Sequence, residues 1–321
     1  MNETLLDKLK VITPEEQMIL DGNMNIQKSL YSNSDEFIID SNHMLATGKL
    51  IDIRPHTRFV HFPTHTHNYI EIIYMCSGST THIVNGDTKI PLKTGQLLFL
   101  NQHASQEILP AGENDIAINF IILPQFFDRC FALFSDENVL RDFLLDALKN
   151  NNGVGTYLHF EVQDILPIQN LIENLIWSLM NSQPNKRNIN QTTMGLLFLQ
   201  LMNHTDKINQ NDPTHYEQNL FFAILKYVEE HYVDASLEEL SAILKQPTYF
   251  LSKLIKKHSS STFKNLLQTK RLNQSVYLLS TTTIPVEEII TLVGYDNTSY
   301  FHKIFKERFG MTPKRYRENC C

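Results

Sequence analysis

Two histidines and a glutamate in the first third of the chain have the types and spacing to bind a metal ion or a polar ligand. The segment His65-Thr-His-Asn-Tyr-Ile-Glu places His65 and His67 two residues apart, with Glu71 at its end and Gly78 seven residues later. Alternate residues of a β-strand point to one face, so these side chains can converge inside a barrel. Imidazole with carboxylate suits Fe, Mn, Ni or Zn. The spacing therefore predicts a metal site or a polar ligand site.

The same spacing is similar to the first motif of the cupins, His-x-His-x3-Glu-x6-Gly. Metal-binding cupins usually take a further histidine from a second motif, two residues after a glycine turn. In this chain the turn Lys93-Thr-Gly-Gln-Leu leads to Leu98 instead, although His103 could stand in from the next loop. Because the second motif fails, we expect no bound metal and no cofactor.

The sequence around these residues predicts a β-rich first domain. Short β-forming segments are separated by turn signals such as Ser77-Gly and Asn85-Gly, at the spacing of an antiparallel sandwich or barrel. Before them, Thr13-Pro-Glu-Glu combines a capping hydroxyl, an early proline and a glutamate, which predicts a helix start. The predicted strands cover residues 36–40, 50–53, 69–74, 80–84, 96–100 and 116–122.

From Pro124 onward the apolar period becomes that of helices. A stripe from Ile168 to Leu179 has helical spacing, and residues 194–202 are almost wholly apolar. The stripe and the adjacent Trp177 offer the aromatic and large aliphatic side chains that self-association uses. We predict a homodimer through this helix. The simpler alternative is that the stripe packs wholly within its own chain.

Two asparagine-rich polar segments, residues 181–190 and 203–214, are predicted breaks between elements. The second break is the predicted boundary between the two halves of the chain. The predicted domains are a β-rich sensor with an N-terminal extension over residues 1–124, a helical layer over residues 125–214, and a helical C-terminal domain over residues 215–321.

The last hundred residues contain an internal repeat. Phe250-Leu-Ser-Lys-Leu-Ile-Lys recurs fifty positions later as Tyr300-Phe-His-Lys-Ile-Phe-Lys. On a helix, the apolar residues of each copy face inward and the lysines face outward. A shorter helix precedes each copy, with a capping box at Ser236 in the first and an end at Gly294 in the second. The pattern predicts two helix-turn-helix units joined by a long helix over residues 263–279.

Outward lysines on such helices have a physical use in DNA binding. The major groove of B-DNA is ~12 Å wide and admits one α-helix, whose outward side chains meet base edges and phosphates. Lys253, Lys256, Lys303 and Lys306 occupy matching positions in the two copies. One isolated copy is explained equally well as a solvated helix face, whereas two matching copies favour DNA binding.

Residues 284–317 resemble, nearly throughout, the signature of the AraC/XylS family of bacterial transcription regulators. They read Ile-Pro-Val-Glu-Glu-Ile-Ile-Thr-Leu-Val-Gly-Tyr-Asp-Asn-Thr-Ser-Tyr-Phe-His-Lys-Ile-Phe-Lys-Glu-Arg-Phe-Gly-Met-Thr-Pro-Lys-Arg-Tyr-Arg. The resemblance implies two helix-turn-helix units that enter successive major grooves, with double-stranded promoter or operator DNA and RNA polymerase as partners. Gln246 and Pro247 depart from the family pattern in the first turn. The predicted DNA-binding residues are Tyr249, Ser252, Lys253, Lys256, Thr298, Ser299, His302, Lys303 and Lys306.

The resemblance also implies a ligand-responsive first domain. The segment that holds the histidine motif is rich in hydrogen-bond donors, Arg54 and His56 among them, which would suit a sugar, a carboxylate or a phosphate-bearing ligand in the mouth of a barrel. For any one of these side chains, a place on the solvent face of a strand is the simpler explanation. Taken together they predict an effector pocket formed by Arg58, His65, His67, Glu71, His82 and His103.

Composition and charge limit the remaining classes. The chain has 321 residues, enough for two domains, and its four cysteines form neither a disulfide framework nor a Cys-x-x-Cys pair. No apolar stretch approaches the ~20 residues that cross a bilayer, and the start lacks the features of a signal peptide. The net charge of -7 divides into -10 before residue 217 and +3 from there on, which permits a polyanion partner for the last third only.

The predicted fold class is therefore α+β: an N-terminal cupin-like antiparallel β-barrel with a helical layer, followed by an all-α domain of two helix-turn-helix units joined by a long helix. We expect a cytoplasmic, nucleoid-associated bacterial DNA-binding regulator controlled by a small-molecule effector and without enzymatic activity, and the sequence leaves both activation and repression of transcription open. Two alternatives remain open: a cupin metalloenzyme, an isomerase or dioxygenase, with an unrelated helical tail, and an effector-independent regulator whose barrel only dimerises. The fifty-residue repeat argues against the enzyme.

Overall fold

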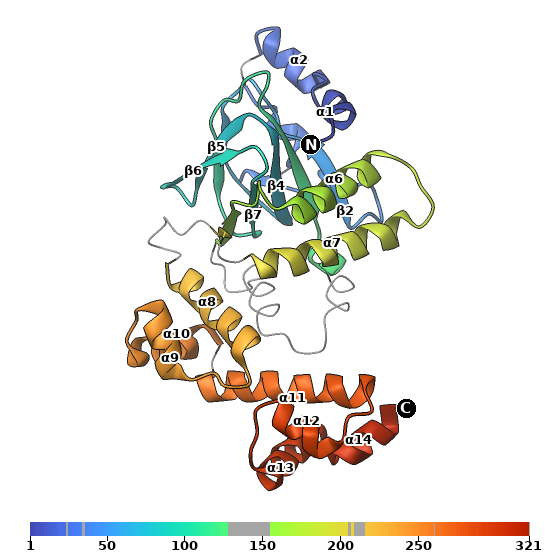
Figure 1. The fold of residues 1–321 in the computed structure, drawn as a ribbon. Coiled ribbons are helices and arrows are strands. Elements are labelled where there is room, and N and C mark those ends of the chain that lie inside the picture. The colour runs from blue at the N-terminus through green and yellow to red at the C-terminus, as the bar shows by residue number, and fades with distance from the viewer. Residues whose placement is uncertain are drawn as a thin grey trace. The chain divides into compact units, whose positions relative to one another are not determined.

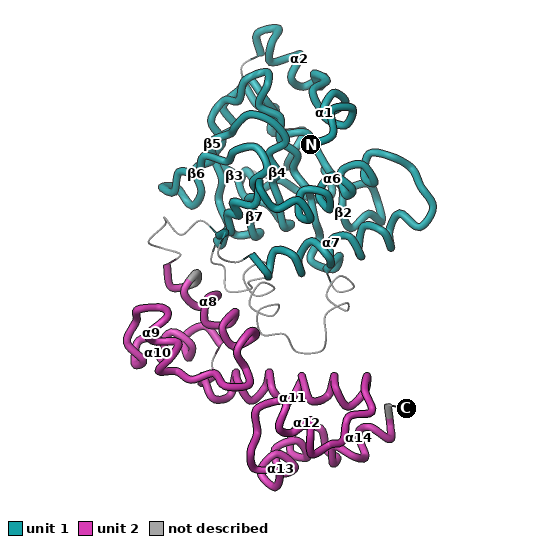
Figure 2. Tube along the Cα trace, viewed as in Figure 1, with its two compact units in different colours: residues 1–133, 144–212 teal, residues 134–143, 213–321 magenta. Residues whose placement is uncertain are grey.

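A computed structural model describes residues 1–23, 25–33, 36–127, 155–204, 207–208, 216–259 and 261–320. These residues divide into two compact units, the first ending at residue 208 and the second beginning at residue 216 (Figure 2). The described strands all belong to the first unit, and the described part of the second unit is helical (Figure 1). The predicted break at residues 203–214 lies largely outside the described residues.

Two five-stranded sheets build the described core of the first unit, in the orders β1-β3-β8-β5-β6 and β10-β7-β4-β9-β2. Neighbouring strands are antiparallel except for β1 and β3, which are parallel. The strands are β1 Ile38–Ile39, β2 Ile51–Pro55, β3 Phe62–His67, β4 Ile70–Ser77, β5 Ser79–Val84, β6 Thr88–Lys93, β7 Leu97–Leu100, β8 Gln106–Ile108, β9 Ile116–Ile122 and β10 Tyr157–Phe160.

Side-chain alternation explains how the two sheets enclose one core. On β4, Ile73 and Met75 join a buried cluster that also contains Val84 from β5 and Leu92 from β6, in the other sheet. The intervening residues of β4 face away from that cluster, yet they are also buried. Tyr74, for example, donates a hydrogen bond of 2.6 Å to Gln169 of a covering helix. The second sheet is therefore buried on both faces, which is why β4 is almost continuously apolar.

The covering helices are α6 Leu166–Met180 and α7 Lys186–Asn203, which pack against each other (Figure 1). Ile168, Ile172 and Leu175 are fully buried and Leu179 is buried, so most of the predicted stripe packs within its own chain, whereas Leu171 is half-buried. Trp177 is half-exposed. Part of the predicted polar break at residues 181–190 is the first turn of α7, and residues 157–160 of the predicted helical layer form strand β10.

Short helices precede the barrel: α1 Glu3–Leu9, α2 Pro14–Leu20, the 3-10 turn Lys28–Leu30 and α3 Ser41–Met44. The predicted helix start is confirmed at α2, where Thr13 and Glu16 form a capping box by exchanging backbone and side-chain hydrogen bonds. No described helix is both long enough and apolar enough to cross a membrane.

The second unit contains the helices predicted from the repeat. Its first trio is α8 Tyr216–His231, α9 Leu237–Leu244 and α10 Thr248–Ser259. The long helix α11 Phe263–Thr281 then leads to α12 Val286–Leu292, α13 Thr298–Phe309 and α14 Pro313–Cys320. The inward residues predicted for the first copy, Leu251, Leu254 and Ile255, are buried, and so are Phe301, Ile304 and Phe305 of the second.

The two turns of the second unit are built differently. Gly294 follows α12 at φ +85°, and a Cβ there would lie 2.3 Å from the carbonyl oxygen of Val233, so only glycine fits. The equivalent turn after α9 has Lys245 at φ +51°, a left-handed conformation that costs more for a residue with a Cβ. The fold class predicted from the sequence is confirmed, whereas β3, β6, β8 and β10 were absent from the predicted strands.

Candidate effector pocket and nucleic-acid interface

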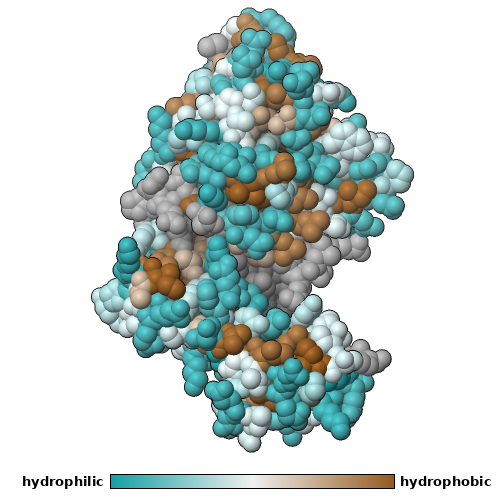
Figure 3. All heavy atoms as spheres, viewed as in Figure 1, coloured by the Kyte–Doolittle hydropathy of each residue, from teal (hydrophilic) through white to brown (hydrophobic). Residues whose placement is uncertain are grey.

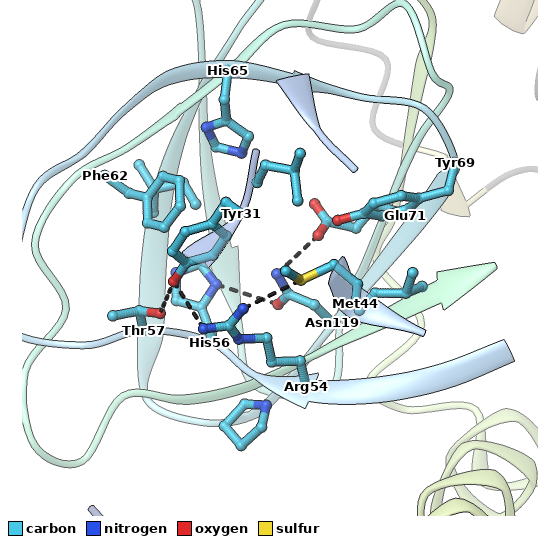
Figure 4. A pocket seen from close by; sticks show the side chains of 14 residues that line it. Tyr31, Met44, Arg54, His56, Thr57, Phe62, His65, Tyr69, Glu71 and Asn119 are labelled. Carbon is cyan, nitrogen blue, oxygen red and sulfur yellow. Dashed lines mark hydrogen bonds between the residues drawn. The ribbon is translucent and has the colours of Figure 1, made fainter. Parts of the chain in front are cut away.

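Polar side chains from several strands surround a small pocket inside the barrel (Figure 4). A register shift in β3 between Phe62 and His65 turns both rings toward it, with ring centroids 4.7 Å apart. The pocket leaves about 30 Å³ for the centres of water-sized molecules, and one water needs roughly 10–15 Å³. The labelled lining residues are Tyr31, Met44, Arg54, His56, Thr57, Phe62, His65, Tyr69, Glu71 and Asn119.

The N-terminal extension closes one side of this pocket. Tyr31 is 2% exposed, and its hydroxyl donates a hydrogen bond of 2.6 Å to Glu15. Arg54 Nη2 lies 2.7 Å from the same carboxylate and donates 2.9 Å to the Tyr31 hydroxyl. The Arg54 guanidinium also lies over the Tyr31 ring, 4.4 Å from its centroid. The only described cation at this pocket is therefore already neutralised by Glu15.

A chain of hydrogen bonds links the polar groups of the pocket floor. Asn119 donates from Nδ2 to Glu71 Oε1 at 3.0 Å, and Asn119 Oδ1 lies 3.3 Å from His56 Nδ1 (Figure 4). His65 Nδ1 lies 2.8 Å from the carbonyl oxygen of Pro63, which fixes its ring. Asn119 thus holds the carboxyl and one imidazole in place.

Burial makes these titratable groups neutral. It lowers the pKa of His56 and that of His65 to about 4, and it holds the pKa of His67 well below its usual range. Burial raises the pKa of Glu71 to about 8, against the lowering effect of the Asn119 hydrogen bond. At neutral pH the interior thus presents uncharged imidazoles and a protonated carboxyl group.

Within the part of the chain that the structure describes, several buried polar atoms in the barrel have no hydrogen-bond partner. They are His56 Nε2, both ring nitrogens of His67, Glu71 Oε2 and Gln106 Oε1. His67 Nε2 and Glu71 Oε2 lie 3.5 Å apart without bonding. Since buried polar atoms are normally paired, so many orphans in one interior indicate a place for a polar guest.

The residues of the histidine motif do not form a metal-ligand group. In the described ranges, no three His, Cys, Asp or Glu side chains are grouped so that they could hold a metal ion. The backbone explains why the motif has glycine at position 78: Gly78 has a φ of +75°, and a Cβ there would lie 2.2 Å from Asp115 Oδ1. The motif therefore fits a polar interior better than a metal centre.

The structure brings only part of the predicted effector set together. His65 and Glu71 line the pocket, and His67 packs beside His65 with ring centroids 4.9 Å apart. His82 lies deeper, fully buried, where it bonds Thr80 and Gln106. Arg58 is not among the lining residues.

Two predicted effector residues lie elsewhere for physical reasons. Arg58 donates to the Glu16 carboxylate and to the carbonyl oxygens of Lys10 and Glu113, so its guanidinium stabilises the fold outside the pocket lining. His103 sits half-buried in the loop after β7, outside the pocket lining.

Sequence reasoning missed Asn119 and Tyr31. Asn119 had a signal, because it is the one polar residue within the apolar strand β9. No sequence signal indicated Tyr31, because it reaches the pocket from the extension before the barrel.

In the first helix-turn-helix unit, the predicted contact residues share one exposed face of α10. Tyr249 is 74% exposed, and Ser252, Lys253 and Lys256 are also exposed. The neighbouring Lys257 differs, because it pairs with Glu217 of α8. Lys253 and Lys256 form no ion pair with any described residue, so this exposed face of α10 carries two cations.

In the second unit, α13 presents the equivalent face. Thr298, Ser299, Lys303 and Lys306 are exposed and His302 is half-buried. Lys303 approaches Glu307 at 4.0 Å, a surface pair that holds the lysine weakly. Asn297 caps the helix by accepting a 2.9 Å hydrogen bond from the backbone of Tyr300.

Two family models match this chain. An AraC-like ligand binding domain matches residues 51–186, and a helix-turn-helix domain matches residues 240–319. The first match covers the barrel with its covering helix α6, and the second covers both predicted DNA-binding helices.

Curated relatives cover most of the chain. The HTH-type transcriptional activators RhaR and RhaS of Mannheimia succiniciproducens are 23% and 25% identical over 80% of this chain, and the matches span 87% and 89% of those proteins. Among solved structures, the C-terminal domain of the two-component response regulator yesN from Fusobacterium nucleatum is 34% identical over 31% of this chain and 98% of that chain, with a TM-score of 0.30.

Proposed function

The chain belongs to the AraC family of transcription regulators, and we propose that it activates transcription by binding promoter DNA through α10 and α13 under the control of a small effector in the barrel. Its curated relatives include proteins described as transcriptional activators. Two features carry this proposed function: the polar pocket inside the barrel, and the exposed faces of α10 and α13. We assign neither feature an enzymatic role.

The observation that carries DNA binding is the match between the two exposed helix faces. Lys253 and Lys303 lie fifty residues apart at equivalent positions, both exposed, each above a buried apolar side of its helix. A helix that enters a major groove needs this division, with an apolar side for its own domain and a cationic side for phosphates and base edges. Two such helices can read two groove segments, and a homodimer would read four.

Binding to genomic DNA tests this proposal. Purified full-length chain is incubated with fragmented genomic DNA, and the recovered fragments are tested as duplexes by fluorescence anisotropy. We expect a limited set of fragments to bind, and the double variant Lys253→Ala/Lys303→Ala to lose at least tenfold in affinity. Lys89→Ala, an exposed lysine on β6 of the first unit, is the matched control and should bind as the parent does. Equal binding of all fragments by all variants would contradict the proposal.

For the effector, the neutral interior favours an uncharged, hydroxyl-rich molecule. The buried imidazoles and the protonated Glu71 supply donors and acceptors without a free charge, and Arg54 is already paired. A polyol or sugar offers the alternating donors and acceptors that the orphaned atoms lack, whereas an anion would find no unpaired cation at this pocket in the described part of the chain. The pocket must widen to admit such a molecule, because its free space is small.

A thermal-shift screen tests the effector class. Neutral monosaccharides and polyols are compared with the corresponding sugar acids, and Asn119→Leu is the variant because it removes the link between His56 and Glu71. We expect a neutral ligand to raise the melting temperature of the parent but not of Asn119→Leu. Stabilisation by sugar acids alone would show that the pocket binds anions.

A further inference from the structure

A second cavity in the first unit lies between the start of β2 and the helices α6 and α7. Its cavity volume is about 260 Å³, just below the roughly 300–1,000 Å³ of small-molecule pockets. Its floor is apolar, formed by Leu50, Ile51, Phe126 and Leu179. The barrel pocket, at about 30 Å³, is much smaller.

One end of this cavity is polar and positive. Lys186, Arg187 and Asn190, all from the first turns of α7, line it there. Lys186 Nζ donates to the carbonyl oxygens of Leu179 and Asn181, both at 3.0 Å, so its position is fixed at the cavity edge. Arg187 is exposed and forms no ion pair with any described residue. The cavity therefore offers an unpaired guanidinium beside a fixed ammonium group.

Asn190 supplies an unused donor inside the cavity. The residue is only 2% exposed, and its Oδ1 accepts a hydrogen bond of 2.5 Å from Ser178. Gln183 in turn donates to the Ser178 hydroxyl, which sets the direction of this chain of bonds and leaves Asn190 Nδ2 as the free donor. Within the described residues, Nδ2 has no acceptor, and it is not one of the fully buried unpaired atoms. It is therefore free to donate to water or to a ligand in the cavity.

The helix start adds to the same polarity. Asn185 precedes α7 in a left-handed conformation and gives it no side-chain cap. The first backbone N–H groups of the helix thus lack a capping acceptor, and the positive end of the helix dipole faces the same region as Arg187.

We propose that this cavity binds an amphipathic organic anion, with its carboxylate at Arg187 and Asn190 and a short apolar tail on Leu50, Phe126 and Leu179. A carboxylate can pair with the guanidinium and accept a hydrogen bond from the Asn190 amide together, and the tail packs on the apolar lining of the cavity. The site is separate from the barrel pocket, although strand β2 contributes to both, through Ile51 at one end and Arg54 at the other.

Calorimetric titration of the full-length chain with octanoate tests the proposal. The matched probes are 1-octanol, which has the tail without the charge, and inorganic phosphate, which has charge without the tail. We expect saturable one-to-one binding of octanoate, at least tenfold tighter than either probe. Arg187→Glu should weaken octanoate at least tenfold, and because Arg187 is exposed and unpaired this variant is expected to fold. Asn190→Leu should weaken it severalfold.

Two controls locate the ligand. Lys89→Glu makes the same kind of charge change on an exposed residue of β6 and should leave octanoate binding unchanged. Glu71→Gln alters the barrel pocket and should also leave it unchanged, so a failure here is distinct from a failure of the proposed effector pocket. The proposal is overturned if octanoate does not saturate, if Arg187→Glu binds it as the parent does, or if Glu71→Gln abolishes binding.

Discussion

Arg58 Nε lies 2.7 Å from Glu16 Oε1, and the two side chains are 3% and 1% exposed. The carboxylate also accepts from the backbone N–H of Thr13 at 2.8 Å and from that of Arg58 at 3.1 Å. One buried ion pair thus joins the capping box of α2 to the segment after β2. It fastens the N-terminal extension to the barrel, and the same extension supplies Tyr31 to the pocket.

Breaking this pair should unfold the extension or the whole first unit. Glu16→Ala leaves the Arg58 charge buried without its partner, which typically costs about 3–5 kcal/mol. We expect a loss of this size in the free energy of unfolding measured by urea denaturation. Asp7→Ala, an exposed partner of Lys10, is the control and should change it by less than about 1 kcal/mol. If Glu16→Ala costs no more than the control, the pair is not what holds the extension.

The buried histidines predict acid sensitivity. The pKa of His56, of His65 and of His159 falls from 6.5 to about 4 on folding because of burial. The unfolded chain therefore takes up protons first as the pH falls, and stability present above pH 6.5 is lost as the pH falls toward 4. Each pKa unit corresponds to about 1.4 kcal/mol, so three such groups approach the total stability of a domain, about 5–15 kcal/mol.

Melting temperatures measured from pH 8 to pH 4 check this expectation. We expect the melting temperature to fall steeply below pH 6.5. The fall should be less steep in His159→Asn and as steep as in the parent in His43→Asn, because His43 is exposed on α3. Glu71 acts in the opposite direction: its pKa is raised from 4.5 to about 8, so its contribution is fully present below pH 4.5 and is lost progressively as the pH rises from 4.5 through 8. Glu71→Gln removes this opposing contribution and should therefore make the fall in melting temperature from pH 8 to pH 4.5 steeper. A parent protein equally stable at pH 4.5 and 7 would contradict the histidine account.

Salt dependence should separate phosphate contacts from base contacts. Affinity for a selected duplex is expected to fall with a log-log slope of about -0.9 per phosphate contact. Lys306→Ala should weaken all duplexes alike and flatten the slope by about one contact. Lys303→Ala or His302→Ala should also relax base preference by about 1–3 kcal/mol at one position. Anisotropy titrations at several salt concentrations measure both effects, and salt-independent binding would exclude a phosphate role for these lysines.

The helical half was predictable because its signals are local. The apolar faces of α10 and α13 follow from spacing along a few turns, and Ser236, Asn297 and Gly294 mark helix ends by their own conformational preferences. Each of these residues acts within its own helix or turn. The repeat supplied the same pattern twice, so both helix-turn-helix units could be located from the sequence alone.

The pocket was less predictable because it depends on distant residues. Arg54 meets Glu15 across 39 positions, and Asn119 meets Glu71 across 48. The histidine motif indicated a polar interior, yet a pattern of ligand types cannot report that Arg58 is taken by Glu16 or that His82 is taken by Thr80 and Gln106. Likewise, the apolar stripe on α6 predicted which face of the helix is buried, but it did not indicate whether the same chain or a second copy covers that face.

The homodimer stays a prediction, and the candidate contact surface is now the side of α6 that carries Trp177. Since Leu175 is buried, a charge there would test folding, whereas Trp177 is 50% exposed on the outer side of α6. Other apolar side chains are exposed on α6 and α7, including Leu166, Ile189 and Leu196. Figure 3 shows hydrophobic surface in the part of the first unit where Figure 1 draws these two helices. An exposed tryptophan is a side chain that interfaces often use as an anchor.

If this face pairs two chains, Trp177→Glu should shift the protein from dimer to monomer at micromolar concentration, because it puts a charge where the interface would bury an aromatic side chain. Its melting temperature when monomeric should stay close to that of the diluted parent, since Trp177 contributes little to the core of its own chain. Gln163→Glu, exposed just before α6, adds the same charge and should leave the dimer intact. Sedimentation velocity measures both. A parent that sediments as a monomer, or a Trp177→Glu variant that remains a dimer, would show that this face does not pair two chains, and the DNA-binding assignment would be unaffected.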